Sequence, residues 1–255
     1  MKNKKLLLLI SPMISFMAVS SFLGISYTVA NFIDYYNTDT TKPSFIDSTT
    51  ENFICYPLQS TNNQNICSIG WAKTIEESEG TLTIPQTVTK EVENETITYQ
   101  VKAIAECGFR FCNFSSITFA SNNIEEIKAE AFYSCQNITT FTMPEKCIHG
   151  VGPSSFMDCR NLVTIDMSGV ASYIEAHRND EDFFEDNPYI IGDHAFTSCV
   201  KLKKFEFPAN LAEIGDSAFM NCKEISGLYL PVNNGVNEIA IRKYAFSVCR
   251  KFKLL

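Results

Sequence analysis

The strongest constraint on this chain is an apolar pattern that returns six times. The stretch from Ile191 to Pro208 reappears from Ile214 to Pro231 as I-x-x-x-A-F-x-x-C-x-x-L-x-x-I-x-I-P. The other copies begin at Ile104, Ile127, Val151 and Ile241. The pattern phenylalanines are Phe109, Phe132, Phe156, Phe196, Phe219 and Phe246, at intervals of 23, 24, 40, 23 and 27 residues. A recurring interval of this length predicts an architecture in which each repeat stacks on the next.

Each repeat has two parts. Its end alternates apolar and polar residues and then stops at a proline, as from Phe141 to Pro144, which predicts one short parallel strand. The A-F-x-x-C-x-x-L part has the spacing of one helical turn or a tight 3₁₀ arc that places its apolar residues on one inner side. A single repeat cannot bury that side alone. Stacking at the strand spacing of about 4.8 Å would build a column of phenylalanines beside a column of cysteines.

The pattern resembles the BspA-type leucine-rich repeats of bacterial and protist surface proteins, over 104–255. The resemblance implies an α/β leucine-rich-repeat solenoid with one short parallel strand and a helical turn in each repeat of about 23 residues. Of the six repeats the last is incomplete. Some repeats depart from the pattern: Gly108 and Ser155 replace alanine, and Phe119 and Met167 are not followed by proline.

The segments before the repeats have different compositions. The stretches from Gly80 to Pro85 and from Tyr99 to Ile104 look like the opening of such an array, so 52–103 is predicted to be a β-rich N-terminal cap. Residues 31–51 are interpreted as a linker. Residues 1–30 have a lysine cluster, an apolar run and small residues up to Ala30, which predicts a signal peptide cleaved after Ala30. The alternative is an uncleaved membrane anchor, because this segment is long enough to cross a bilayer.

The charge of the chain excludes some partners. Removal of residues 1–30 removes three lysines and no acidic residue, which leaves 18 basic against 29 acidic residues and a net charge of −11. A surface this acidic repels nucleic acid and anionic lipid. No nucleic-acid partner is therefore expected, and membrane contact is expected only through the N-terminal segment if it is not cleaved.

The ten cysteines fall into two groups. Six occupy one repeat position, where parallel side chains at the coil spacing lie slightly too far apart for disulfides, so free buried thiols are expected. These six are Cys112, Cys135, Cys159, Cys199, Cys222 and Cys249. In the cap, Cys55 and Cys67 bracket a polar loop and are candidates for a disulfide. Cys107 and Cys147 have no predicted partner.

No catalytic or cofactor motif is visible. The histidines at 149, 177 and 194 are scattered over different repeats, and the chain has no metal-ligand spacing, nucleophile elbow or phosphate-binding loop. Cys199 and His194 are five residues apart, but the cysteine belongs to the column expected to be buried. The sequence therefore predicts no enzyme, no metal site and no cofactor.

One interval is longer than the others. The 40 residues between Phe156 and Phe196 contain an insertion at 171–189, and insertions in stacked repeats usually leave as loops on one face. Three interpretations stay open for this loop: a solvated surface loop, a partner-binding loop with Phe183 and Phe184 as anchors, and a loose calcium site.

A second candidate surface follows from the alternation of the predicted strands. If the apolar residues face the core, the intervening residues project from the concave face of the sheet. These residues are Thr118, Thr140, Thr142, Thr164, Asp166, Lys204, Glu206 and Tyr229. A threonine-rich, mildly charged face suits contact with a protein or a glycan, although threonine also favours strands for structural reasons.

The resemblance implies a secreted or cell-surface module that binds proteins or acts in adhesion, using an extended concave face. Two alternatives remain at this stage: a structural spacer of the cell envelope without a dedicated ligand, and an enzyme or inhibitor, which the absent motifs disfavour.

Overall fold

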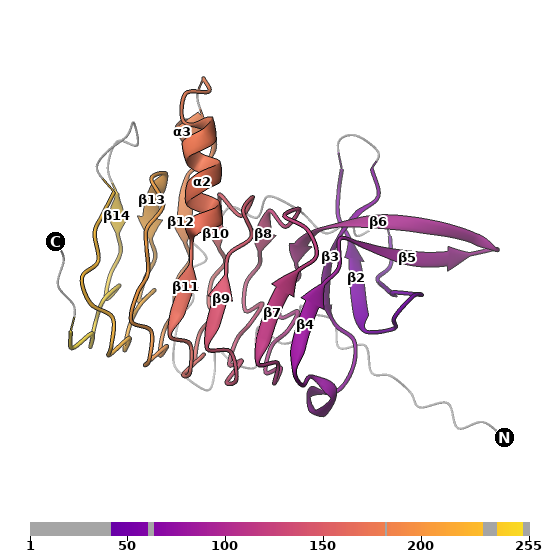
Figure 1. Cartoon of the computed structure of the whole chain (residues 1–255), viewed down its shortest axis with the longest axis horizontal. Helices are drawn as coiled ribbons and strands as arrows, with labels where there is room; N and C mark the ends of the chain where they lie inside the picture. Colours follow the sequence, from indigo (N-terminus) through magenta and orange to yellow (C-terminus); the bar gives the residue numbers. More distant parts are fainter. Residues whose placement is uncertain (1–41, 61–63, 182, 232–238, 252–255) are drawn as a thin grey trace. The chain divides into compact units, whose positions relative to one another are not determined.

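The computed structural model describes residues 42–60, 64–181, 183–231 and 239–251, which form a stack of coils built mostly of β-structure (Figure 1). The predicted signal peptide, its cleavage after Ala30 and the first part of the predicted linker lie outside the described residues. Within the described part, no helix combines the length and the apolar character that a membrane span requires.

A ten-stranded sheet, here called the long sheet, runs through the whole stack. In the repeats its strands are parallel, one from each coil: β8 (Glu126–Ile127), β10 (Gly150–Val151), β12 (Tyr189–Ile191), β13 (Leu211–Ile214) and β14 (Ala240–Ile241). Val151 is in register with Ile127 and Ile191, so one apolar residue of each coil lines up with the next. The sequence analysis did not predict these strands, because they lie at the start of the repeat and not before its proline.

The predicted strands form two smaller sheets on the other side of the coils. β4 (Thr81–Ile84) pairs with β7 (Ser116–Phe119), and β9 (Thr140–Thr142) pairs with β11 (Thr164–Asp166), all in parallel. The coil with β8 and β9 and the coil with β10 and β11 therefore contain two strands each, and not one. After β11 this side of the described chain retains isolated bridges in place of strands, one between Thr164 and Lys204 and another at Leu228.

Of the two conformations predicted for this part of each repeat, the regular helical turn is wrong, and the bonds span three residues as in a tight 3₁₀ arc. The A-F-x-x-C segment is a series of tight turns: the amide of Ala131 bonds to the carbonyl of Lys128 at 3.3 Å, and that of Tyr133 to Glu130 at 3.1 Å. Glu130 (φ 54°) and Ser134 (φ 56°) adopt the left-handed conformation, which a right-handed helix excludes. The described chain has two α-helices, both in the insertion, and one short 3₁₀ helix at Ile75–Glu77.

The backbone of these turns also forms hydrogen bonds with the next coil. The amides of Glu130, Phe132 and Ser134 donate to carbonyls of the following coil at 2.9, 2.8 and 2.8 Å. The same two positions have positive φ in every repeat. Alternate amides thus continue the intercoil ladder around the bend, and this satisfies backbone groups that a tight turn would otherwise leave unpaired.

The core lies between the long sheet and the short strands. The pattern phenylalanines stack face to face along it, with ring centroids of successive pairs 5.2 to 5.6 Å apart. From the short strands, Phe141 contacts Phe156 edge-on at 4.8 Å. Phe109, Phe132, Phe156, Phe196 and Phe219 are fully buried. Offset or edge-on aromatic contacts add to the burial of apolar area, so this column is the main source of cohesion between coils.

The cysteine column is a second line of contact between coils. Each thiol from Cys135 onwards donates to the carbonyl of the pattern phenylalanine in the preceding coil, as Cys135 does to Phe109 at 3.1 Å. The equivalent distances for Cys159, Cys199, Cys222 and Cys249 are 3.1, 3.2, 3.1 and 3.0 Å. All ten cysteines are free thiols in the structure. Cysteine suits this position because it is small, apolar and still supplies one weak donor.

The cap precedes the repeats and contains antiparallel pairs. β1 (Phe45–Ile46) pairs with β2 (Phe53–Pro57), and β2 pairs with β3 (Ile66–Trp71). β5 (Thr87–Val92) and β6 (Glu95–Ile104) form a hairpin, and β6 then pairs in parallel with β3 and β8. β6 therefore joins the cap to the long sheet of the repeats.

The insertion is helical and not the predicted loop. α2 (Ser168–His177) follows β11, and α3 (Phe183–Asp186) precedes β12. A carboxylate oxygen of Asp166 accepts the amide of Ser168 at 3.0 Å, which satisfies a free donor at the start of α2. Val170 and Ile174 bury the apolar side of this helix.

Candidate binding face

The side chains that project from β4, β7, β9 and β11 form one surface, here called the threonine face. Its members are Thr81, Thr83, Ser116, Thr118, Thr140, Thr142, Thr164 and Asp166. Ser116 and Thr164 are half-buried and the other six are exposed. Seven of these eight residues carry a hydroxyl group, so the surface offers hydrogen-bond donors and acceptors with little net charge.

The strand register arranges these residues in two columns. Thr81 pairs with Ser116 and Thr83 with Thr118 in one sheet. In the other, Thr140 pairs with Thr164 and Thr142 with Asp166, and β9 lies beside β7 (Figure 1). Paired residues in adjacent strands lie about 4.8 Å apart, so each column is a regular row. The hydroxyls of Thr83 and Thr118 are within 3.1 Å of each other.

Beyond β11 the residues next along this surface are charged or aromatic and no longer threonine or serine. The bridge to Thr164 places Lys204 next in the row, where it forms an ion pair with Glu206. Hydrogen bonds from Ser168, and then the charge of Lys204, hold the pKa of Asp166 below its ordinary value. Tyr229 lies one coil further along and is 67% exposed. The eight residues predicted for the concave face are therefore at the surface, on the side of the short strands and not on the long sheet.

The two phenylalanines of the insertion, which one interpretation made anchors for a partner, pack toward the core. Phe183 is buried and Phe184 is half-buried against the core. The ring of His177 stacks on Tyr173 at 4.1 Å and on Phe183 at 5.9 Å. These rings hold the two helices of the insertion together. The part of the chain that the structure describes also contains no group of acidic, cysteine or histidine residues able to hold a metal ion.

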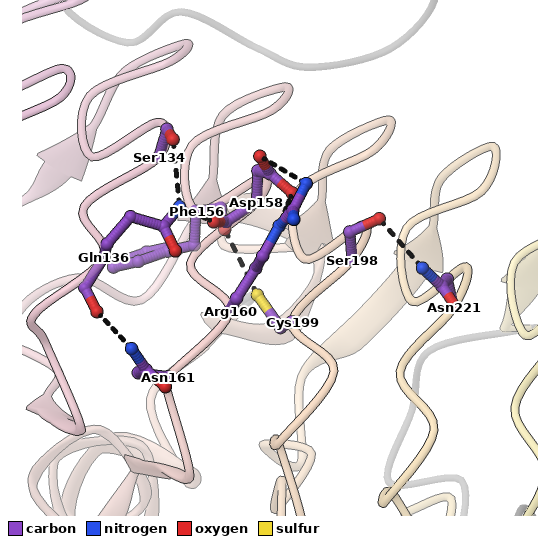
Figure 2. A network of polar contacts seen from close by, with 9 residues as sticks. All are labelled: Ser134, Gln136, Phe156, Asp158, Arg160, Asn161, Ser198, Cys199 and Asn221. Carbon is purple, nitrogen blue, oxygen red and sulfur yellow. Dashed lines mark hydrogen bonds and ion pairs between the residues drawn. The ribbon is translucent and has the colours of Figure 1, made fainter.

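The outer edge of the turns carries a second set of polar residues, shown in Figure 2. Their contacts run mainly from coil to coil. The side-chain amide of Asn161 donates to the backbone carbonyl of Gln136 at 2.8 Å, and the side-chain amide of Asn221 donates to the hydroxyl of Ser198 at 3.1 Å. Arg160 pairs with Asp158 at 2.8 Å within one coil. These groups are already engaged with each other, so this edge offers a ligand less than the threonine face does.

The cysteine and histidine that are closest in sequence do not form a catalytic pair. Cys199 is fully buried and donates to the carbonyl of Phe156, and its burial raises the pKa of its thiol well above the ordinary value. His194 is also buried, which lowers its pKa, and its Nδ1 lies 3.4 Å from the hydroxyl of Thr197. A thiol that stays protonated and inaccessible is a poor nucleophile.

In the cap, Cys55 and Cys67 come close together. Both are fully buried, on neighbouring strands with Cys55 opposite Ile69 and Cys67 opposite Pro57. A hydrogen bond with Cys55 and burial raise the pKa of the Cys67 thiol. The structure thus places the predicted pair side by side as thiols, and a disulfide between them remains a prediction.

The sequence analysis missed the hairpin of the cap. Val92 and Glu95 close a two-residue turn of Glu93 (φ 49°) and Asn94 (φ 68°), flanked by strands that alternate apolar and polar residues. This turn with two positive φ angles is the type that favours short hairpins, and the asparagine between alternating runs was the available signal.

In the described chain, successive coils are joined by parallel strands, by a column of stacked phenylalanines and by repeated hydrogen bonds. These features define it as a leucine-rich-repeat protein. Residues 83–178 and 181–255, more than half of the chain, match the family described as the BspA type leucine rich repeat region, in six copies. The chain belongs to this family, as its sequence pattern predicted. A comparison with curated proteins gives no significant match.

Two solved structures show the same fold. A leucine rich cell surface protein from Faecalibacterium prausnitzii is 17% identical, with a TM-score of 0.55, and the match covers 84% of this chain. This chain spans 54% of the length of that protein. The leucine rich repeat protein of T. pallidum is 19% identical, with a TM-score of 0.58, over 82% of this chain and 80% of the other. At these identities the likeness concerns the fold alone.

Proposed function

We propose that this protein is a secreted or cell-surface binding module, without enzymatic activity, which recognises a protein or glycan through the threonine face of a leucine-rich-repeat solenoid. The observation that carries the proposal is the group of exposed hydroxyls on three neighbouring strands, which are those of Thr81, Thr83, Thr118, Thr140 and Thr142. Such a surface is rigid, because each strand is held by its neighbours, and it is long enough to contact several units of an extended ligand.

The chemistry of the face supports a polar ligand. Hydroxyls both donate and accept hydrogen bonds, and threonine loses little side-chain entropy when it is held by a ligand, because its χ1 angle is already restricted. The ion pair of Lys204 and Glu206 gives one end of the face a polarity that would orient the ligand. Surface location is supported by the family, by the name of the Faecalibacterium protein, and by the lysine cluster and apolar run at the start of the chain.

The experiment compares the wild-type chain with a variant of the face and a variant of the insertion. Thr118→Lys with Thr142→Lys places two long cations on the face and spares Asp166, which supports α2. The matched control is Ala171→Lys with Ala176→Lys, at two exposed positions of α2 with the same change in charge. Binding is measured by surface plasmon resonance on arrays of glycans and of extracellular matrix proteins.

The expected result is a ligand that binds the wild type and the control equally, and the face variant at least about tenfold more weakly. A ligand that fails to bind only the control variant would place the binding site on the insertion. Failure of all three proteins to bind any member of the arrays would favour the second candidate function, a structural spacer of the cell envelope.

A further inference from the structure

The hairpin of the cap extends beyond the sheet that supports it (Figure 1). β6 pairs with β5 from Glu95 to Gln100, but with β3 only from Gln100 onwards. Among the described strands, the residues from Glu95 to Tyr99 therefore have a neighbour on one side only. The positions from Glu91 to Thr96 are all exposed.

The turn determines which backbone groups of this ribbon point outward. In a two-residue hairpin the closing pair, Val92 and Glu95, exchanges hydrogen bonds, so the pair of Thr89 and Thr98 directs its amides and carbonyls away from the ribbon. On the β5 edge these groups are occupied: the amide of Thr89 donates to Asp47 at 2.9 Å, and its carbonyl accepts the amide of Ser48 at 2.9 Å. On the β6 edge, the outward groups of Thr96 and Thr98 make no hydrogen bond to the described residues.

The side chains around this edge are acidic on a partly apolar ribbon. Glu91, Glu93 and Glu95 are exposed at the tip, and Ile97 is half-buried beside them. Lys90, which pairs with Ile97 across the hairpin, lies over the ring of Phe45 at 5.3 Å. The β6 edge thus combines backbone groups that have no partner among the described residues, a half-buried apolar residue and an excess of negative charge.

We propose that the β6 edge at Glu95–Tyr99 is a docking site for an extended segment of a partner protein in which basic and apolar residues alternate. The segment adds as a strand and bonds to the outward groups of Thr96 and Thr98. Its apolar residues pack against Ile97 and its basic residues face the glutamates of the tip. A second copy of this chain is a poorer occupant, because its own edge has the same negative charge and offers no basic residues to the glutamates of the tip.

This site lies in the cap, on different residues from the threonine face, so each proposal can fail without the other. The probe is a synthetic peptide of about eight residues with alternating lysine and valine, and its binding to the wild-type chain is measured by fluorescence anisotropy. A peptide with glutamate in place of lysine tests the charge. A lysine and valine peptide N-methylated at alternate residues tests the backbone bonds.

Two variants test the edge itself. Glu91→Gln with Glu93→Gln and Glu95→Gln removes the negative charge, and its matched control removes the same charge elsewhere with Glu79→Gln, Glu181→Gln and Glu185→Gln, all at exposed positions. Thr98→Pro removes one outward amide but no bond between β5 and β6. Circular dichroism and thermal melting verify that each variant is folded.

The hairpin charge variant is expected to bind the basic peptide about tenfold more weakly at low salt, with the charge control unchanged. Thr98→Pro and the N-methylated peptide are expected to lose binding. Equal binding by all variants, or no binding of the basic peptide to the wild type, would overturn the proposal. So would a dimer, detected by light scattering, that Thr98→Pro converts to a monomer, because the occupant would then be a second copy.

Discussion

The two sides of each coil both direct apolar residues into the core but differ in the pairing of their strands. The long sheet continues through every described repeat, across the insertion, from β8 to β14. The short-strand side pairs regularly only as far as β11 and then retains the bridge between Thr164 and Lys204. Both sides alternate or align apolar residues, so the apolar pattern alone does not decide where a continuous sheet forms.

The difference comes from where the insertion leaves the stack. α2 begins at Ser168, two residues after β11 ends, so the chain turns away from the short-strand side. It returns directly at β12, which pairs with β10 through Gly150 opposite Ile190 and Val151 opposite Ile191. The turns next to the long sheet also remain bonded across the insertion, as the amide of Ser154 to the carbonyl of Asp193 at 2.8 Å shows. The long-sheet side therefore carries the continuity of the stack.

The core shared by both sides gives the largest expected effect. Phe156→Ala removes a ring that stacks on Phe132 and Phe196 and contacts Phe141 edge-on. We expect a loss of about 3–5 kcal/mol in the free energy of unfolding, measured by chemical denaturation. The control is Phe111→Ala, because Phe111 is 43% exposed. It should lower the free energy of unfolding by less than about 1 kcal/mol. Equal losses would mean that the column does not hold the coils together.

Two glycines compare the sides directly. Gly150 in the long sheet has φ +115°, and a Cβ there would lie 1.8 Å from the carbonyl oxygen of Ile190. Gly227, on the short-strand side, has φ +59° and no atom within 4 Å of a Cβ. Gly150→Ala should therefore lower the free energy of unfolding by about 3 kcal/mol and Gly227→Ala by about 1 kcal/mol. A reversed order would contradict the greater rigidity of the long-sheet side.

Acid should weaken the long-sheet side through His149, which precedes β10. Burial lowers the pKa of this imidazole to about 4 from its ordinary value of 6.5. The unfolded chain takes up a proton below about pH 6.5 and the folded chain does so only near pH 4, so stability is lost as the pH falls through this window. Part of the ring contacts solvent, and the expected loss is about 1–2 kcal/mol. Denaturation of His149→Gln at several pH values should show a flatter profile, and an unchanged profile would assign the acid sensitivity to other groups.

The smallest effect concerns the left-handed positions of the turns. Val248 has φ 62°, an unfavourable conformation for a β-branched residue. Because its side chain is 58% exposed, Val248→Gly loses little packing and should raise the free energy of unfolding by about 0.5–1 kcal/mol. Val248→Ala keeps the Cβ and serves as the control, with a smaller gain expected. Thermal melting of both variants would detect the difference, and a destabilised glycine variant would contradict it.

The sequence predicted the repeat and its interior well. The frame from Ile127 to Pro144 identified Ala131, Phe132 and Cys135 as inner residues, and all are buried. The alternation around Phe141 also identified the residues of the threonine face that reach the surface. These predictions succeeded because burial of apolar groups depends on a local pattern that the chain repeats.

The conformation of the turns and the role of the insertion were not predictable in this way. A helical turn and the observed series of tight turns bury the same residues, and the choice between them depends on bonds such as that from Phe132 to Ser155 of the next coil. One of the three interpretations left open for the insertion made Phe183 an exposed anchor, because an isolated segment does not reveal which neighbour covers it. In the structure its neighbour is His177, within the same insertion.

The amino-acid sequence by itself determined which residues of each repeat enter the core, because their spacing leaves no other way to remove them from water. Only the tertiary structure decided which backbone groups pair, since an amide in one coil finds its carbonyl in the next, 20 or more residues away. The pairing of backbone groups decided that the long sheet is continuous, that the short-strand side is interrupted and that the cap hairpin has a free edge in the described chain. Hydrogen bonds between coils select among conformations that bury the apolar residues equally well.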